Sequence, residues 1–114
     1  MSERDELYLE HILEAIAAIK RYTAGGRAAF FADDMVQSAV VRQLEIIGEA
    51  AKNLSAELTS RETAVPWKQA ARTRDLLIHG YFRIDLDIVW NIVEHELIPL
   101  RDNVLRILGR TAHT

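Results

Sequence analysis

The sequence predicts an all-α protein that folds as an antiparallel four-helix bundle. Apolar residues recur every three or four positions over long stretches, and no stretch alternates as a half-buried strand does. The chain has 114 residues, of which 49% are hydrophobic and 27% charged, with 5 glycines and 2 prolines. This length and composition predict a single domain over residues 1–114 and exclude a disordered or low-complexity chain.

The first predicted helix begins after Ser2 and ends near Thr23, ahead of the pair Gly25-Gly26. Ser2 is a favourable N-cap, and Asp5 three residues later makes an imperfect capping box. Glycines in succession are typical of a helix end. The apolar stripe of this helix consists of Leu9, Ile12, Leu13, Ile16 and Ile19.

The second predicted helix runs from about Asp34 to Leu54, with Asp33 or Asp34 at its favourable N-terminal end. Its residues at helical spacing are Val36, Val40, Leu44, Ile47, Ala51 and Leu54. The stretches Ala24–Asp33 and Ser55–Val65 break the periodic pattern and are predicted to be loops.

A third helix is predicted from Pro66, which suits a first helical turn, to Gly80. A fourth begins near Asp85, a good N-cap, and is disturbed at Pro99, which lacks a backbone N–H. Its apolar face comprises Leu86, Val89, Ile92, Val93, Leu97, Val104, Leu105 and Leu108. The tail over residues 109–114 has no large apolar anchor and is expected to fray.

The net charge of -3 and the absence of cysteine limit the classes of function. A net negative charge does not favour nonspecific binding to nucleic acids. Without cysteine there is no disulfide, thiol nucleophile or cysteine-based zinc site. No apolar run approaches the ~20 residues that span a bilayer, and the N-terminus does not resemble a signal peptide, so a cytoplasmic location is expected.

Positive charge is concentrated between residues 66 and 83. This window carries four basic residues against Asp75 alone, a local charge of +3 that leaves -6 for the rest of the chain. The basic residues are Lys68, Arg72, Arg74 and Arg83.

A guanidinium, an imidazole and a phenol fall within eight residues of this window, at Arg74, His79 and Tyr81. Asp75 lies four residues before His79, close enough on a helix to fix its tautomer. Arg72 lies seven residues before His79 and shares its helical face, whereas Arg74 shares that face only if His79 lies in the terminating turn. The choice of phosphate-binding arginine between Arg72 and Arg74 stays open.

Arginine beside histidine suits phosphate chemistry that needs no metal, because guanidinium binds two phosphoryl oxygens and imidazole transfers protons near neutral pH. RNA supplies its own nucleophile, the 2′-hydroxyl, whose attack on the adjacent phosphate leaves a cyclic phosphate. The reaction needs a base and an acid, and one protomer offers one well-placed histidine. A two-fold homodimer with this segment near its axis would provide both.

The run Arg74-Asp75-x-x-x-His79-Gly80-Tyr81 resembles the R-x4-6-H signature of HEPN-domain ribonucleases, in the R-x4-H-x-Y form of HepT toxins from HepT/MntA toxin–antitoxin pairs. The resemblance covers roughly residues 9–100. It is also carried by the segments 42–52 (Arg-Gln-Leu-Glu-Ile-Ile-Gly-Glu-Ala-Ala-Lys), 65–67 (Val-Pro-Trp), 81–85 (Tyr-Phe-x-Ile-Asp) and 89–90 (Val-Trp). An Arg-Thr pair stands before Arg74 where a Gly-Met-like pair is more usual.

The resemblance implies a dimeric, metal-independent endoribonuclease toxin without a cofactor, in which Arg74 and His79 line the cleft with Asp75 beside them. Tyr81 matches the tyrosine that an MntA-like minimal nucleotidyltransferase antitoxin modifies with AMP. The added charge and bulk would obstruct RNA.

The residues alone leave two other functions open. The first is a non-catalytic HEPN module that binds RNA, nucleotide or a nucleotidyltransferase through the same cleft. The second is a purely structural dimerisation bundle, which would leave the basic window without a purpose.

A carboxylate-bridged metal centre is not expected, because neither His11 nor His95 completes a Glu-x-x-His pair. His95 is expected on the surface, and Glu45 and Glu49 on a solvated helix face.

Overall fold

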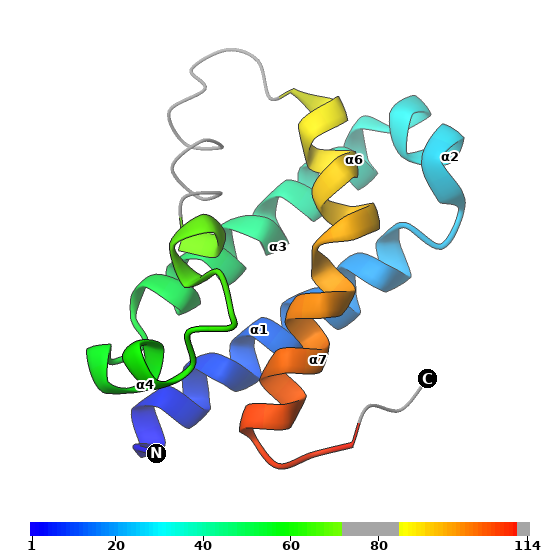
Figure 1. Ribbon diagram of the computed structural model, residues 1–114. Coiled ribbons are helices and arrows are strands. Elements are labelled where there is room, and N and C mark those ends of the chain that lie inside the picture. Colours follow the sequence, from blue (N-terminus) through cyan, green and yellow to red (C-terminus); the bar gives the residue numbers. More distant parts are fainter. Residues whose placement is uncertain (72–84, 112–114) are drawn as a thin grey trace.

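The computed structural model describes residues 1–71 and 85–111, which form helices and turns and contain no strand (Figure 1). The all-α prediction is therefore confirmed. None of the described helices has both the length and the apolar character needed to cross a membrane. In chain order they are α1 (Glu3–Tyr22), α2 (Gly26–Ala32), α3 (Asp34–Lys52), α4 (Ala56–Arg61), α6 (Leu86–His95) and α7 (Leu97–Ile107), and residues 67–71 form a further helical turn.

The two long helices α1 and α3 lie side by side in antiparallel directions, and α6 and α7 follow one another across them (Figure 1). The predicted apolar stripes meet in one core. Some stripe residues are only partly buried against it, namely Leu13, Val36, Leu86, Val93 and Leu108, and Leu105 is not part of it. Complete burial of such a side chain contributes about 1.5–3 kcal/mol. The side chains that are at most 1% exposed are Leu9, Ile12, Ile16, Ile19, Phe30, Val40, Leu44, Leu58, Val89 and Val104.

The N-terminal caps of α1 and α3 follow the prediction. The Ser2 hydroxyl accepts a hydrogen bond from the N–H of Asp5 at 3.1 Å. Asp33, one of the two predicted candidates, caps α3 by accepting from the N–H groups of Met35 at 3.0 Å and Val36 at 3.3 Å. Each cap pairs backbone donors that have no partner within the helix.

Only half of the predicted capping box forms, because the Asp5 N–H donates to Ser2 whereas the Asp5 carboxylate faces α4. Asp5 is 4% exposed and accepts hydrogen bonds from the Ser55 N–H at 2.8 Å and the Ser55 hydroxyl at 2.6 Å. Burial acts to raise the pKa of Asp5, but the bonds from Ser55, with a smaller contribution from Ser2, outweigh it and hold the pKa below its usual value. A buried carboxylate thus ties the start of α1 to the start of α4.

The two segments predicted to be loops each contain a short helix, which corrects that prediction. In α2 the anchor is Phe30, 1% exposed, and in α4 it is Leu58, also 1% exposed. Ser55 caps α4 by accepting from the Leu58 N–H at 3.1 Å. A helix held by one buried side chain shows no apolar periodicity, so tertiary burial decides its conformation.

The predicted fourth helix is divided into α6 and α7 at Glu96. Pro99 lies in the first turn of α7, where it cannot donate a hydrogen bond to the carbonyl of His95, and the break falls at that point. At its C-terminus α7 ends in a Schellman motif, with Gly109 at φ 71° and the Arg110 N–H bonded to the Leu105 carbonyl at 2.8 Å. The Arg110 guanidinium pairs with Glu10 of α1, and this hydrogen bond raises the pKa of Arg110.

Candidate functional site

The residues predicted to carry the chemistry lie within 72–84, outside the described residues. They are Arg72, Arg74, Asp75, His79 and Tyr81. The structure describes the two ends of chain that flank this segment, residues 65–71 before it and residues 85–95 after it. These flanks place the segment between the helical turn after Pro66 and the start of α6.

The flank before the segment is anchored by Val65 and Trp67. Their side chains are 3% and 7% exposed, and the Trp67 indole N–H donates to the carbonyl of Glu62 at 3.0 Å. The Pro66 carbonyl accepts the first helical bond, from the Ala70 N–H at 3.1 Å, so the predicted start of the third helix is confirmed. Trp67 is thus a core residue, and its burial argues against a role in stacking on RNA.

The flank after the segment is anchored by Asp85, which is the N-cap of α6 as predicted. Its carboxylate accepts from the N–H of Asp87 at 3.0 Å and of Ile88 at 3.4 Å. One turn further on, Val89 is fully buried. Trp90 is partly buried against the core, with its ring 5.3 Å from that of Phe30.

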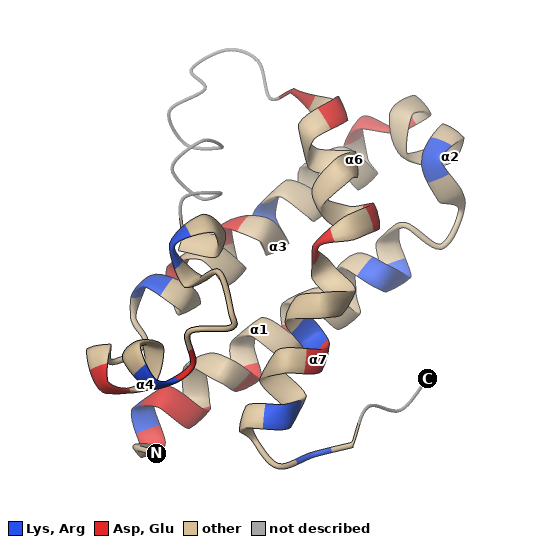
Figure 2. Ribbon diagram, viewed as in Figure 1, with Lys and Arg blue, Asp and Glu red and all other residues tan. Residues whose placement is uncertain are grey.

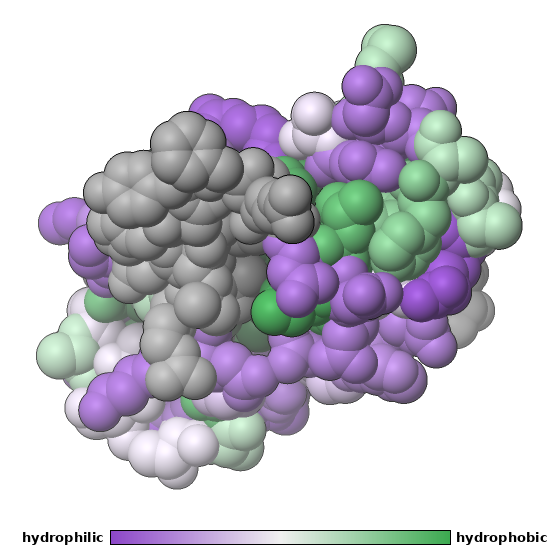
Figure 3. All heavy atoms as spheres, turned by 90° about the horizontal axis from the view of Figure 1, so that it is seen from above, coloured by the Kyte–Doolittle hydropathy of each residue, from purple (hydrophilic) through white to green (hydrophobic). Residues whose placement is uncertain are grey.

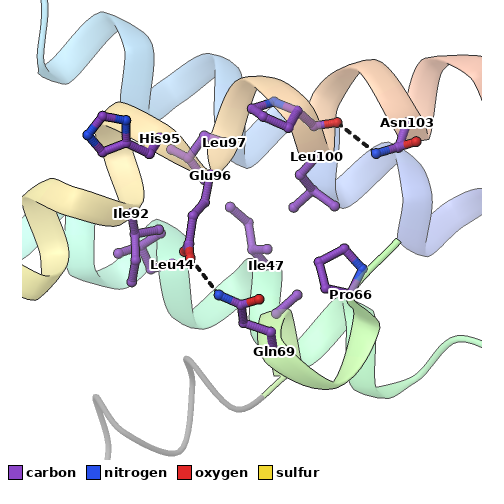
Figure 4. Close-up of a pocket in the computed structure, with 12 residues that line it drawn as sticks. Leu44, Ile47, Pro66, Gln69, Ile92, His95, Glu96, Leu97, Leu100 and Asn103 are labelled. Carbon is purple, nitrogen blue, oxygen red and sulfur yellow. Dashed lines mark hydrogen bonds between the residues drawn. The ribbon is translucent and has the colours of Figure 1, made fainter. Parts of the chain in front are cut away.

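A hydrogen bond joins the first flank to the junction of α6 and α7. The Gln69 amide donates through Nε2 to Glu96 Oε1 at 2.6 Å (Figure 4). Both residues line an apolar pocket of about 190 Å³ between α3, the helical turn, α6 and α7. The pocket is lined mainly by Leu44, Ile47, Pro66, Ile92, Leu97 and Leu100. Sequence reasoning missed the Gln69–Glu96 pair, because nothing in the sequence relates two residues 27 positions apart.

His95 lies at the edge of this pocket with 64% of its side chain exposed, so the surface position predicted for it is confirmed. The nearest described charge is Glu94, whose Oε1 lies 3.7 Å from His95 Nε2. In residues 1–71 and 85–111, no three His, Asp or Glu side chains are grouped closely enough to hold a metal ion.

A second hollow of about 290 Å³ lies between α1 and α3 and is more polar. Arg42 Nη1 lies 3.4 Å from Glu45 Oε2, and Tyr8 meets His11 edge to face with ring centroids 5.8 Å apart. Glu49, on the exposed side of α3, also lines it. The predicted solvated face holds for Glu49, whereas the Glu45 side chain is only 30% exposed.

The end of the molecule where α3 and α6 begin carries exposed apolar side chains. Met35 is 79% exposed and Ile88 is 49% exposed. Seen from this end, hydrophobic surface lies among polar residues beside the part drawn in grey (Figure 3). Arg27 lies here too, 3.4 Å from Asp87 and over the ring of Phe31.

Comparison with known proteins identifies relatives over nearly the whole chain. "Probable ribonuclease HepT" of Thermococcus cleftensis is 41% identical over 95 residues, covering 82% of this chain and 86% of the relative. "Putative RNase TTE0752" of Caldanaerobacter subterraneus subsp. tengcongensis is 43% identical over 104 residues, covering 90% of this chain and 93% of the relative. No solved structure gives a significant match.

A longer relative is "Gamma-glutamylcyclotransferase and putative RNase MJ0434" of Methanocaldococcus jannaschii, 41% identical over 104 residues. The match covers 90% of this chain but only 47% of that relative, so this chain spans about half its length. The model of the family described as "HepT-like: Ribonuclease HepT-like" matches residues 12–107, a span that includes both flanks and the segment between them. By this match and by these relatives, the chain belongs to the HepT-like ribonuclease family.

Proposed function

We propose that this protein is a metal-independent endoribonuclease that acts as the toxin of a toxin–antitoxin pair. The observation that carries the proposal is the family match over residues 12–107, which spans Arg74 and His79. The local charge of +3 between residues 66 and 83, in a chain of net charge -3, adds to it, because an RNA substrate needs a local positive surface.

In this proposal the RNA 2′-hydroxyl is the nucleophile. Neutral His79 removes the 2′-hydroxyl proton as O2′ attacks the adjacent phosphorus, and Arg74 stabilises the charge that develops on the phosphoryl oxygens. The bond from phosphorus to O5′ breaks, leaving a 2′,3′-cyclic phosphate on one fragment. The departing O5′ takes a proton from a protonated imidazole and so becomes the 5′-hydroxyl of the other fragment.

The second imidazole is His79 of the partner subunit in a two-fold homodimer. A two-fold axis brings the same segment of both copies together, so one histidine can act as base while the other acts as acid. Asp75 is the positioning residue that accepts from His79 and fixes its tautomer. Arg72 supplies further positive charge, and is the alternative ligand of the scissile phosphate.

Regulation in this proposal falls on Tyr81. A minimal nucleotidyltransferase antitoxin transfers AMP from ATP to the Tyr81 oxygen, which forms a bond to the α-phosphorus as pyrophosphate leaves. The new phosphate would place negative charge two residues from His79, where an RNA phosphate must otherwise bind, and so block the substrate.

Cleavage is tested by incubating the purified protein, never exposed to a nucleotidyltransferase, with total RNA and tRNA in EDTA. We expect fragments with cyclic phosphate ends from the wild type and intact RNA with His79→Ala. His95→Ala is the matched control, because His95 is exposed and lies outside the segment. Intact RNA with the wild type, with Tyr81 shown by mass to be unmodified, would overturn the proposal in favour of a non-catalytic binding module.

Modification is tested by co-expression with a minimal nucleotidyltransferase and mass measurement of the intact chain. We expect addition of AMP units to the wild type and to Tyr22→Phe, and none to Tyr81→Phe. Tyr22 is a suitable control because it is 37% exposed at the end of α1. Modification of Tyr81→Phe to the same extent as the wild type would contradict the assignment.

A further inference from the structure

A groove beside residue 71 carries basic and hydroxyl side chains. It has a volume of about 560 Å³ and lies between the C-terminal end of α3 and the stretch from α4 to the helical turn. Its polar lining consists of Lys52, Lys68, Thr59, Ser60 and Thr63, and we call it the lysine groove. Buried apolar side chains, among them Leu54, Val65 and Trp67, form its floor.

No carboxylate of the described residues lines the lysine groove, which sets it apart from the two hollows described above. The apolar pocket includes Glu96, and the hollow between α1 and α3 includes Glu45 and Glu49. Both lysines are exposed, and within residues 1–71 and 85–111 neither has a carboxylate within ion-pair distance. Two cations without an ion-pair partner among the described residues therefore share one concave surface of an acidic protein, which favours an anionic ligand.

The hydroxyl groups make the groove a source of donors as well as of charge. The Thr59 hydroxyl is already committed, because it donates to the Ser55 carbonyl at 3.2 Å. Ser60 and Thr63 are exposed and can donate to a ligand. Ammonium and hydroxyl groups over an apolar floor suit the phosphate oxygens of a nucleic acid backbone, which only accept hydrogen bonds.

The lysine groove reaches the residue that immediately precedes the proposed catalytic segment in the chain. Ala71 lines the groove and is followed directly in the chain by Arg72. In Figure 2, basic residues are seen at the end of α3 and at the helical turn, next to the point where the grey trace begins. Arg74 follows Ala71 by three positions in the chain, so we expect an RNA strand whose scissile phosphate is bound by Arg74 to have neighbouring phosphates near this surface.

We propose that the lysine groove is a substrate-binding subsite that holds the phosphodiester backbone of single-stranded RNA beside the scissile bond, with Lys52 and Lys68 each neutralising a phosphate. The inference rests on the proposed function, since the groove would give the proposed ribonuclease a second contact with its RNA substrate. The lysines are positioning residues: they hold the strand and take no part in the transfer of protons.

The test measures binding of a non-cleavable 2′-O-methyl RNA to the full-length protein as a function of salt concentration. We expect the double variant Lys52→Gln/Lys68→Gln to bind about tenfold or more weakly at 0.1 M salt. The logarithm of the association constant for RNA falls linearly with the logarithm of salt concentration. The magnitude of this slope should decrease by about 1.4 in the double variant, because each phosphate neutralised on a single strand contributes about 0.7. The variant Lys52→Arg/Lys68→Arg keeps both charges and should restore the slope.

Lys20→Gln is the matched control for the single variant Lys52→Gln, because each removes one positive charge. Lys20 and Lys52 are both exposed and both lie in the last turn of a long helix, so their removal has the same effect on net charge and on the helix dipole. We expect Lys20→Gln to leave RNA affinity unchanged. An equal loss of affinity with Lys20→Gln would show only a general effect of charge and would overturn the subsite.

Cleavage of a normal RNA by the same proteins separates the two proposals. Cleavage by the wild type, together with unchanged RNA affinity and salt slope in the double lysine variant, would overturn the subsite and leave the proposed function intact. Salt-dependent RNA binding that needs both lysines, without cleavage by the wild type, would support the subsite and overturn the proposed endoribonuclease activity. If the 2′-O-methyl RNA does not bind to the wild type at all, the subsite is wrong.

Discussion

The side chains of Gln69 and Glu96 are joined by a hydrogen bond of 2.6 Å, although 27 positions separate them in the sequence. Gln69 lies in the helical turn that leads into the proposed catalytic segment, and Glu96 lies at the junction of α6 and α7 (Figure 4). The bond therefore links the start of that segment to the helix that follows it. We expect this bond to affect the proposed cleavage of RNA more than the stability of the fold.

Gln69→Ala is expected to lower the rate of RNA cleavage by about threefold to tenfold, because the residues that follow would be held less rigidly. The free energy of unfolding should fall by no more than ~1 kcal/mol, since a partly exposed hydrogen bond contributes little. Cleavage assays and urea unfolding check the two effects. The control is Asn103→Ala, because Asn103 lines the same pocket and its amide bonds only residues of its own helix α7, donating to the Pro99 carbonyl at 3.1 Å and accepting from Arg106 at 3.4 Å. Equal rates for the two variants would show that the Gln69–Glu96 bond does not position the segment.

Asp5→Asn is expected to lower the free energy of unfolding at neutral pH by about 1–3 kcal/mol, because the amide cannot accept from both Ser55 donors through two oxygens. The pKa of Asp5 is lowered on folding, so the carboxylate stabilises the protein above its unfolded pKa of about 4. That contribution is lost as the pH falls through the folded pKa. The difference between wild type and variant should therefore shrink between pH 6 and pH 2.

Urea unfolding at a series of pH values measures this difference, with Asp34→Asn as the control. Asp34 is also in the first turn of a long helix, but it is exposed. Replacing Asp34 should lower the free energy of unfolding by about 0.3–1 kcal/mol, because only its interaction with the helix dipole is lost. A difference between wild type and Asp5→Asn that stays constant across this pH range would contradict the lowered pKa.

Much of the fold could be predicted because its long helices carry several apolar residues at helical spacing. The limits of α1 followed from Ser2 and the glycine pair, and the division of the last helix followed from Pro99. The short helices α2 and α4 could not be predicted, since one buried residue in each leaves no periodic signal. The contact of Asp5 with Ser55 joins residues 50 positions apart, and such pairs depend on how the helices pack.

The candidate site, in contrast, could be proposed from the sequence. Its proposed groups, from Arg72 to Tyr81, are close together in the chain, so a local motif could identify them. The lysine groove was only half visible, because Lys68 belongs to the basic window whereas Lys52 comes from α3. Its assembly depends on the end of α3 meeting the chain after α4, which no local pattern specifies.

Phe30→Ala is expected to lower the free energy of unfolding by about 3–5 kcal/mol, the usual effect of removing a buried aromatic ring. Phe30 is 1% exposed, and its ring lies 5.3 Å from that of Phe31 and 5.3 Å from that of Trp90. Its loss would leave α2 without its buried anchor. Phe31→Ala is the control and should cost less, because Phe31 is only partly buried. Thermal unfolding of both variants measures the difference, and a greater loss with Phe31→Ala would contradict this account of α2.

Gly109→Ala is expected to lower the free energy of unfolding by about 1 kcal/mol, because a side chain at φ 71° is strained. Apart from the two chain neighbours, no atom of the described residues lies within 4 Å of the position that a Cβ would take, so the cost is one of backbone conformation and not of collision. Gly109→Asn should cost less, since asparagine tolerates the left-handed region better than alanine does. Urea unfolding of the three proteins tests this order. Equal stability of the wild type and Gly109→Ala would show that the Schellman motif, and the Arg110–Glu10 pair that follows it, does not depend on glycine.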